Sequence, residues 1–226
     1  MTQIYLVPRW FQGYDVTFEI VFALITLAVS LFSFKIYKLS QQKESKYFGI
    51  SFLLISLSYF VWAFLNLRLV SEIKEGVSAL ELKDLLVFST ASIYIYMILA
   101  MVGFIILAYT ALKIENPSAF LLITLISIAG LILSGNKTAM LSIASSFLLL
   151  FIFSRYYLEY RKNHNLRTGL IMIAFFLLFL GNMGFLFVQS NYVYYVVRHI
   201  LELAAYLLVL ISLIWIIKHG QKKKPA

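Results

Sequence analysis

Seven long apolar runs set the limits on how this chain can fold. They cover residues 14–39, 47–70, 84–112, 118–134, 138–158, 166–188 and 191–218. A helix needs about 20 apolar residues to cross the hydrocarbon core of a bilayer, and only the run over 118–134 is shorter than that. The runs are continuous rather than alternating, which excludes the strands of a membrane β-barrel. The sequence therefore predicts an all-α integral membrane protein, a bundle of seven transmembrane helices that forms one domain over residues 1–226.

The composition points to the same class of protein. Hydrophobic residues make up 62% of the chain and charged residues only 13%, too few polar side chains to cover a soluble domain of this length. There is no Cys, which excludes disulfides, thiolate metal sites and cysteine nucleophiles. The net charge of +9 is explained by basic residues beside the spans. We therefore expect the lipid bilayer to be the main partner and expect no nucleic-acid partner.

The Lys and Arg residues predict how the bundle is oriented. Thirteen flank one set of span ends: Lys35, Lys38, Lys43, Lys46, Lys113, Arg155, Arg161, Lys162, Arg167, Lys218, Lys222, Lys223 and Lys224. Six flank the other set: Arg9, Arg68, Lys74, Lys83, Lys137 and Arg198. Cytoplasmic flanks carry the excess of positive charge. We therefore predict a cell-membrane protein with the N-terminus outside and the C-terminus inside, which an odd number of spans requires.

Two connections between the spans carry further patterns. Residues 71–84, SEIKEGVSALELKD, mix charged and apolar side chains and predict a short amphipathic helix on the membrane surface. Residues 34–57 and 154–179 share an aromatic, basic helix end, a basic loop and a glycine early in the next span. We interpret this likeness as chance similarity between apolar helices. The alternative is a pair of parallel repeats, as in some small transporters.

The last run carries the main indication of function, because three ionisable residues lie in its first half. Arg198, His199 and Glu202 share one helix face with Tyr195 and Tyr206 by their spacings of three and four residues. Glu202 would lie about 13 Å inside the end of its helix, close to mid-bilayer. A charge at that depth costs at least about 2.5–3.5 kcal/mol. We therefore expect Glu202 to face the bundle interior and Arg198 to pair with Glu202 or Glu19.

Other spans carry polar groups at a similar depth: Asp15, Glu19, Trp62, Asn66, Thr90, Tyr94 and Asn182. Together with the residues of the last span they predict an outward-facing polar cavity that binds a small polar ligand or an ion. If His199 contacts that ligand, binding should respond to pH between about 5 and 8. The alternative is a purely structural ion-pair network in which Glu19 meets Arg198 or His199 and holds the last helix against the first.

The topology is similar to that of rhodopsins, receptor-type sensor modules and seven-span metal hydrolases, but their decisive residues are missing. A retinal Schiff base needs a Lys in the middle of the last span, where this chain has only Lys218 at the end. The metal hydrolases need several intramembrane His residues, and His199 is alone. We find no nucleophile motif either. We therefore predict no cofactor and lean against an enzyme.

Three functions remain. The preferred one is a sensor or receptor-like binding module, whose signal would pass to a separate cytoplasmic protein. The alternative is a small proton- or ion-coupled transporter, favoured by Glu202 near mid-bilayer. The third is a metal-dependent membrane enzyme that would use His199, Glu202 and Glu19 as ligands. The sequence predicts neither the identity of the ligand nor the oligomeric state.

Overall fold

The protein is a bundle of seven α-helices in the computed structural model. The structure describes residues 13–75, 79–114, 116–188 and 193–220, and the side chains of residues 13–68, 87–114, 116–188 and 193–218. The helices are α1 (Tyr14–Ser40), α2 (Lys43–Glu75), α3 (Ala79–Leu112), α4 (Pro117–Leu133), α5 (Lys137–Asn163), α6 (Leu166–Phe185) and α7 (Val193–Gly220). No strand occurs in the described ranges. The predicted all-α membrane bundle is confirmed.

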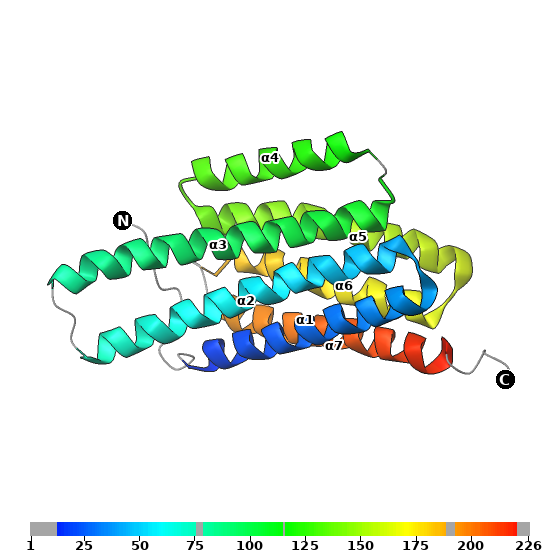
Figure 1. The fold of residues 1–226 in the computed structure, drawn as a ribbon, viewed down its shortest axis with the longest axis horizontal. Coiled ribbons are helices and arrows are strands. Elements are labelled where there is room, and N and C mark those ends of the chain that lie inside the picture. The colour runs from blue at the N-terminus through cyan, green and yellow to red at the C-terminus, as the bar shows by residue number, and fades with distance from the viewer. Residues whose placement is uncertain (1–12, 76–78, 115, 189–192, 221–226) are drawn as a thin grey trace.

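Consecutive helices run in opposite directions, so that the bundle has two distinct ends (Figure 1). We call the end where α1, α3, α5 and α7 begin the N-end, and the end where they finish the C-end. Six helices close a ring in which α1 packs on α2 and α7, α3 packs on α2 and α5, and α6 packs on α5 and α7. The seventh, α4, lies outside this ring against α3 and α5 (Figure 1).

Six of the seven helices are long and apolar enough to cross a membrane, and α4 is the shorter exception. Its 17 residues extend about 25 Å, at the lower limit for a spanning helix. Among its residues only Leu131 is buried, while Leu122, Ile126 and Leu133 are more than half exposed. An apolar helix with so little contact to its neighbours presents most of its surface to lipid.

The connection between α2 and α3 differs from the prediction. Instead of a separate surface helix over residues 71–84, α2 continues to Glu75 and α3 already begins at Ala79. Both helices therefore extend into the segment for which a separate surface helix was predicted (Figure 1). The charged residues of this segment are compatible with helix.

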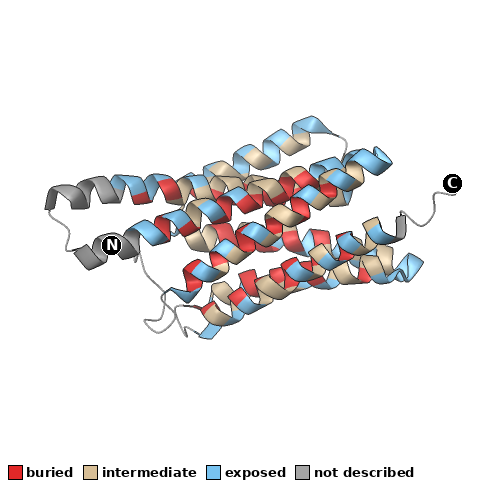
Figure 2. Cartoon of the chain, turned by 60° about the horizontal axis from the view of Figure 1, so that its bottom comes forward, coloured by how far each residue is buried: buried red, intermediate tan, exposed pale blue. Residues whose placement is uncertain are grey.

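The buried residues lie on the sides of the helices that face one another (Figure 2), and many of them are large and apolar. Phe22, Phe52 and Phe175 are fully buried there, and Tyr206 is 1% exposed. In a membrane this packing is stabilised by van der Waals contact. Lipid tails are as apolar as these side chains, so the hydrophobic effect does not drive the helices together. Gly103 shows how close the helices come: a Cβ atom there would lie 2.8 Å from Ile55 Cγ1 and 3.0 Å from the Ser51 carbonyl oxygen.

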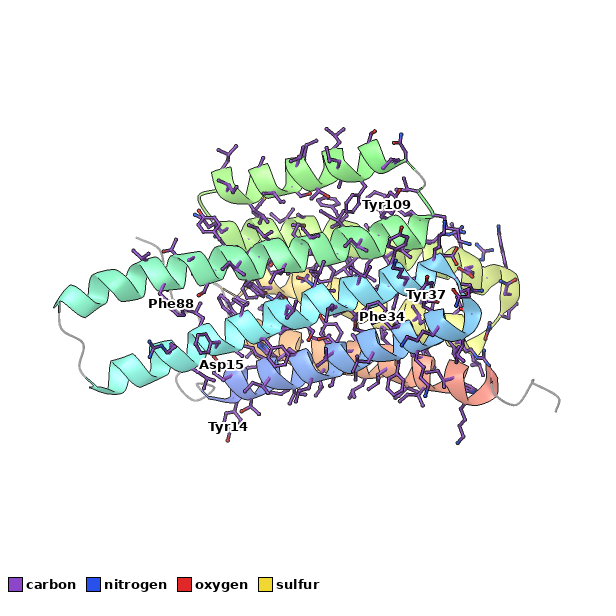
Figure 3. The ribbon with its side chains drawn as sticks, viewed as in Figure 1. Tyr14, Asp15, Phe34, Tyr37, Phe88 and Tyr109 are labelled. Carbon is purple, nitrogen blue, oxygen red and sulfur yellow. The ribbon has the colours of Figure 1, made fainter. Side chains whose placement is uncertain are left out.

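Aromatic side chains mark both ends of the bundle. Tyr14 and Phe88 lie toward the N-end, and Tyr37 and Tyr109 lie toward the C-end (Figure 3). Aromatic residues gather at membrane–water interfaces, where one part of the ring is buried and the other part is wet. This distribution fits a chain that crosses the bilayer repeatedly. The orientation with the N-end outside stays a prediction from the charge distribution.

Candidate functional site

A cavity of about 70 Å³ lies among the helices in the N-end half of the ring. Residues from six helices line it, and four of them carry the polar groups of the predicted cluster: Glu19, Arg198, His199 and Glu202. Tyr59, Trp62, Tyr96, Phe185 and Tyr195 provide aromatic walls, and Thr138 and Ser142 line it from α5. Helices α1, α2, α3, α5, α6 and α7 thus contribute side chains to one space.

Helix α7 presents its polar face to the bundle interior. Tyr195, His199, Glu202 and Tyr206 are all less than 9% exposed. The side chain of Arg198 is 15% exposed, and its Nε donates to Glu202 Oε1 at 2.8 Å. Arg198 therefore pairs within its own helix, one turn away. This satisfies both charges without a partner from another helix.

An aromatic ring also contacts the guanidinium of Arg198. Its Cζ atom lies 4.4 Å from the centroid of the Phe185 ring, a cation–π contact with α6. Tyr96 of α3 lines the same cavity. The guanidinium is thus held by an anion of its own helix and a ring of α6.

Glu19 has different surroundings. Both of its carboxylate oxygens accept hydrogen bonds from Asn66 Nδ2 of α2, at 2.8 and 3.0 Å. No Lys, Arg or His nitrogen lies within 4.0 Å of this carboxylate in the described part of the chain. Of the two partners predicted for Arg198, Glu202 is therefore the one that pairs with it. The neutral amide of Asn66 reaches Glu19 instead.

His199 is packed among aromatic rings. Its ring centroid lies 4.5 Å from that of Tyr195 and 5.8 Å from that of Phe22. Its Nδ1 lies 2.8 Å from the carbonyl oxygen of Tyr195. A carbonyl oxygen only accepts, so Nδ1 carries the proton in this contact. The imidazole is held in one orientation, with one edge at the cavity.

Two hydroxyl groups close the cavity toward the bundle centre. Tyr59 of α2 and Tyr206 of α7 share a hydrogen bond of 2.9 Å between their phenol oxygens. The ring of Phe22 packs at an angle against both, with centroid distances of 5.3 and 5.8 Å. On the C-end side of Glu19 and Glu202, aromatic side chains therefore fill the interior.

Asp15 and Asn182 are buried but lie beside the cavity rather than in its wall. Asp15 Oδ1 accepts from the backbone N–H groups of Gly13 and Val16, so this side chain holds the start of α1 at the N-end (Figure 3). Asn182 accepts from Ser145 Oγ at 3.1 Å and donates to a carbonyl oxygen of its own helix. It lines a second, very small space of about 10 Å³ beneath the main cavity.

The residues predicted on α3 are the wrong ones. Thr90 is exposed, and Tyr94 contacts Lys137, whose Nζ lies 5.3 Å from the centroid of its ring. Tyr96 takes the place predicted for Tyr94. The error is one of helix register: positions two apart on a helix point about 200° apart. A signal existed in the small and polar residues that share the Tyr96 face, which include Ser89, Ser92, Ala100 and Gly103.

Tyr59 is the second residue that the sequence analysis missed. It lies one turn from Trp62 and two turns from Asn66, so its position on the polar face of α2 was readable from the spacing. A tyrosine in an apolar run resembles ordinary core until its hydroxyl partner is known. That partner, Tyr206, lies far away in the sequence.

The described residues hold no group of three or more His, Asp or Glu side chains close enough to bind a metal ion. His199, Glu202 and Glu19, the candidate ligands, line one cavity but do not converge on one point. Comparison of the chain with models of known families, with curated proteins and with solved structures finds no match.

Proposed function

We propose that this protein is a membrane-embedded binding module, receptor-like in its mode of action, whose N-end cavity binds a small cation such as ammonium or a protonated primary amine. The observation that carries the proposal is the charge balance of the cavity. Its walls hold two carboxylates, Glu19 and Glu202, and a single guanidinium, Arg198, which is already paired with Glu202. When it is ionised, Glu19 is therefore a buried anion whose hydrogen-bond donor in the described structure is the neutral amide of Asn66.

A buried charge must find a partner or lose its charge, because desolvation is expensive in an apolar environment. Asn66 donates hydrogen bonds to the carboxylate but adds no positive charge. A bound cation would balance the site. An anion would instead meet two carboxylates, so the electrostatics favour cations over anions.

The aromatic walls support the same class of ligand. The rings of Trp62 and Tyr96 pack against each other at a tilt, with centroids 4.7 Å apart, and Tyr59 and Tyr195 line other sides of the cavity. Faces of aromatic rings attract ammonium groups, and such cages are a recurrent means of binding them. A site for a metal ion would place more oxygen ligands around one point.

The size of the cavity limits the ligand. A water molecule occupies about 10–15 Å³ by the same measure, so 70 Å³ holds about five water-sized groups. Ammonium or methylammonium fits this space together with a few waters, whereas a nucleotide or a lipid headgroup does not. With the predicted orientation the ligand arrives from outside, and its signal passes at the C-end to a separate cytoplasmic protein.

Thermal stabilisation of the purified protein in detergent tests this proposal. We expect ammonium and methylammonium chloride to raise the melting temperature in a saturable manner, and tetramethylammonium, sodium chloride and sodium acetate at equal ionic strength to have no such effect. The change Glu19→Gln keeps an acceptor for Asn66 and should abolish the stabilisation. Glu159→Gln, a carboxylate at the C-end, is the matched control and should leave it intact. A cluster that serves only as an ion pair would show no saturable effect of any amine.

A further inference from the structure

A second and larger cavity opens at the C-end of the ring. Its volume is about 280 Å³, and side chains of all six ring helices line it. A water-sized group takes about 10–15 Å³ by this measure, so the cavity holds roughly 20 such groups. A molecule from the aqueous phase at the C-end reaches this space directly, whereas a phospholipid has to pass between two packed helices. The cavity is therefore large enough for a small organic molecule that comes from water.

The mouth of this cavity carries charges of both signs. Lys113 Nζ lies 3.5 Å from Glu44 Oε1, and both side chains are more than half exposed. An exposed pair of this kind contributes little to stability, so Lys113 is available to another carboxylate. Glu159 of α5 lines the same cavity, and no Lys, Arg or His nitrogen lies within 4.0 Å of its carboxylate among the described side chains. The cavity thus offers one available cation and one anion without a cationic partner.

The inner part of the cavity is mainly apolar. Leu213 of α7 lies seven residues before Gly220, which places it about 10 Å inside the end of its helix. Ile171 of α6 lines the cavity beside it. Glu44 and Lys113, by contrast, lie within two residues of the ends of α2 and α3. A ligand in this space therefore has its charged groups at the mouth and an apolar part that points inward.

We propose that this C-end cavity binds a zwitterion with an apolar body, namely a free amino acid with an aliphatic side chain such as leucine. The carboxylate of the ligand pairs with Lys113, its ammonium group pairs with Glu159, and its side chain lies against Leu213 and Ile171. Leucine has about nine non-hydrogen atoms, so it fits this cavity together with several waters. It is too large for the N-end cavity, which holds about five water-sized groups. The inference does not depend on the proposed binding of amines.

The charges around the cavity favour a zwitterion over a simple ion. A simple anion that approaches Lys113 meets the carboxylates of Glu44 and Glu159. A simple cation has to pass exposed basic residues at the C-end, which include Lys38, Lys43, Lys46, Arg161, Lys162 and Lys218. A zwitterion has no net charge, so this field does not repel it, and each of its charged groups meets an opposite charge in the cavity. The headgroup of phosphatidylethanolamine has the same chemistry, so the experiment includes its soluble form.

Equilibrium dialysis with isotopically labelled L-leucine tests the inference, on protein purified in detergent without phospholipid. We expect saturable binding of one leucine per chain. 4-Methylpentanoate and isoamylamine, which are leucine without its ammonium group and without its carboxylate, should not displace it at equal concentration. Glycerophosphoethanolamine should not displace it either. Lys113→Gln and Glu159→Gln should each weaken binding at least about tenfold, because each removes one charge-assisted contact with the ligand.

The matched control is Lys38→Gln, which removes an exposed positive charge at the same end of the bundle but lines neither of the two cavities. This variant should bind leucine like the parent. The melting temperature checks the folding of every variant. Should Glu159→Gln fail to fold, Lys113→Gln carries the test, because Lys113 is exposed.

Three results overturn the inference: no saturable leucine binding to the folded parent, unchanged binding in folded Lys113→Gln, or displacement by either single-charge analogue as effective as by leucine. Displacement by glycerophosphoethanolamine overturns the amino-acid assignment in favour of a lipid headgroup. Glu19→Gln should lose the stabilisation by methylammonium and keep leucine binding. A failure here is therefore separable from a failure of the proposed binding function.

Discussion

At the scale of single residues, the cavity contains two carboxylates with opposite situations. Glu202 is paired with Arg198 of its own helix, and Glu19 of α1 accepts hydrogen bonds from the neutral amide of Asn66 of α2. The spacing of four residues made the first arrangement predictable from the sequence. The second arrangement depends on which face α2 turns toward α1, and a single sequence does not contain that information. Glu19 gives the site its excess of negative charge and therefore its preference for a cation.

The Arg198–Glu202 pair supplies a prediction about stability. Arg198→Ala leaves Glu202 buried without its cation, and we expect the free energy of unfolding to fall by about 3–5 kcal/mol. The double change Arg198→Met with Glu202→Leu removes both charges and should restore much of that loss. Unfolding by titration with a denaturing detergent measures both values.

Lys35→Ala is the control for the loss of a positive charge, since this side chain is exposed near the C-end and should change the stability by less than about 0.5 kcal/mol. A loss below about 1 kcal/mol for Arg198→Ala would mean that Glu202 does not depend on this pair.

At the scale of the helices, the sequence predicted seven helices, and the structure has seven in the described ranges. Each apolar run is long enough for a helix and is separated from the next by turn residues. Sequence analysis failed at the facing ends of α2 and α3, which extend into the predicted surface segment, and where helix rotation decides which side chain points inward. Tyr94 and Tyr96 illustrate the second failure. Helix α3 is apolar on nearly all sides, so the pattern of its residues does not fix its rotation.

Two turns at the C-end share a geometry that the sequence likeness of residues 34–57 and 154–179 only hinted at. The α1–α2 and α5–α6 connections each have two residues, and the first of each, Gln41 and His164, is left-handed with φ of 56° and 43°. In both, its N–H donates to the carbonyl oxygen of a tyrosine, Tyr37 or Tyr160, at 2.8 Å. Short antiparallel helix connections use few conformations, so this similarity does not require a repeat.

The left-handed residues supply the second prediction. Glycine has no Cβ to clash in this conformation, but it is also more flexible in the unfolded chain. The net effect of Gln41→Gly and of His164→Gly should be a rise of about 0.5–1 kcal/mol in the free energy of unfolding. Ser154→Gly, in the middle of α5, serves as the control and should lower the stability by about 0.5 kcal/mol. The same detergent titration measures all three. Destabilisation by both cap changes would show that these side chains have contacts that outweigh the strain.

At the scale of the whole molecule, six helices form the ring that encloses both cavities and α4 lies outside it. The sequence predicted seven spans but not this division, because the pattern of α4 differs from the others only in length. An outer helix lets α3 pack directly on α5, and this contact brings Tyr96 and Ser142 to the same cavity. Whether α4 crosses the bilayer decides whether the chain ends on opposite sides of it.

The absence of Cys from the chain makes that topology directly testable. Single cysteines at Gln42, Ser118 and Gly135 lie in exposed positions, and at Gly135 no atom lies within 4 Å of an added Cβ. With the N-end outside, a membrane-impermeant maleimide should label Gly135→Cys in intact cells, and Gln42→Cys and Ser118→Cys only after permeabilisation. Labelling of Ser118→Cys and Gly135→Cys from the same side of the membrane would show that α4 does not span. The reverse pattern for Gln42 and Gly135 would invert the orientation.

The central claim is that the N-end cavity binds a small cation through Glu19, and equilibrium dialysis with isotopically labelled methylammonium measures this most directly. The account predicts saturable binding of one methylammonium per chain, which is lost in Glu19→Gln, retained in Glu159→Gln and displaced by ammonium but not by tetramethylammonium. No saturable binding to the folded parent protein, or unchanged binding in Glu19→Gln, would contradict the claim and leave the polar cluster with a structural role alone.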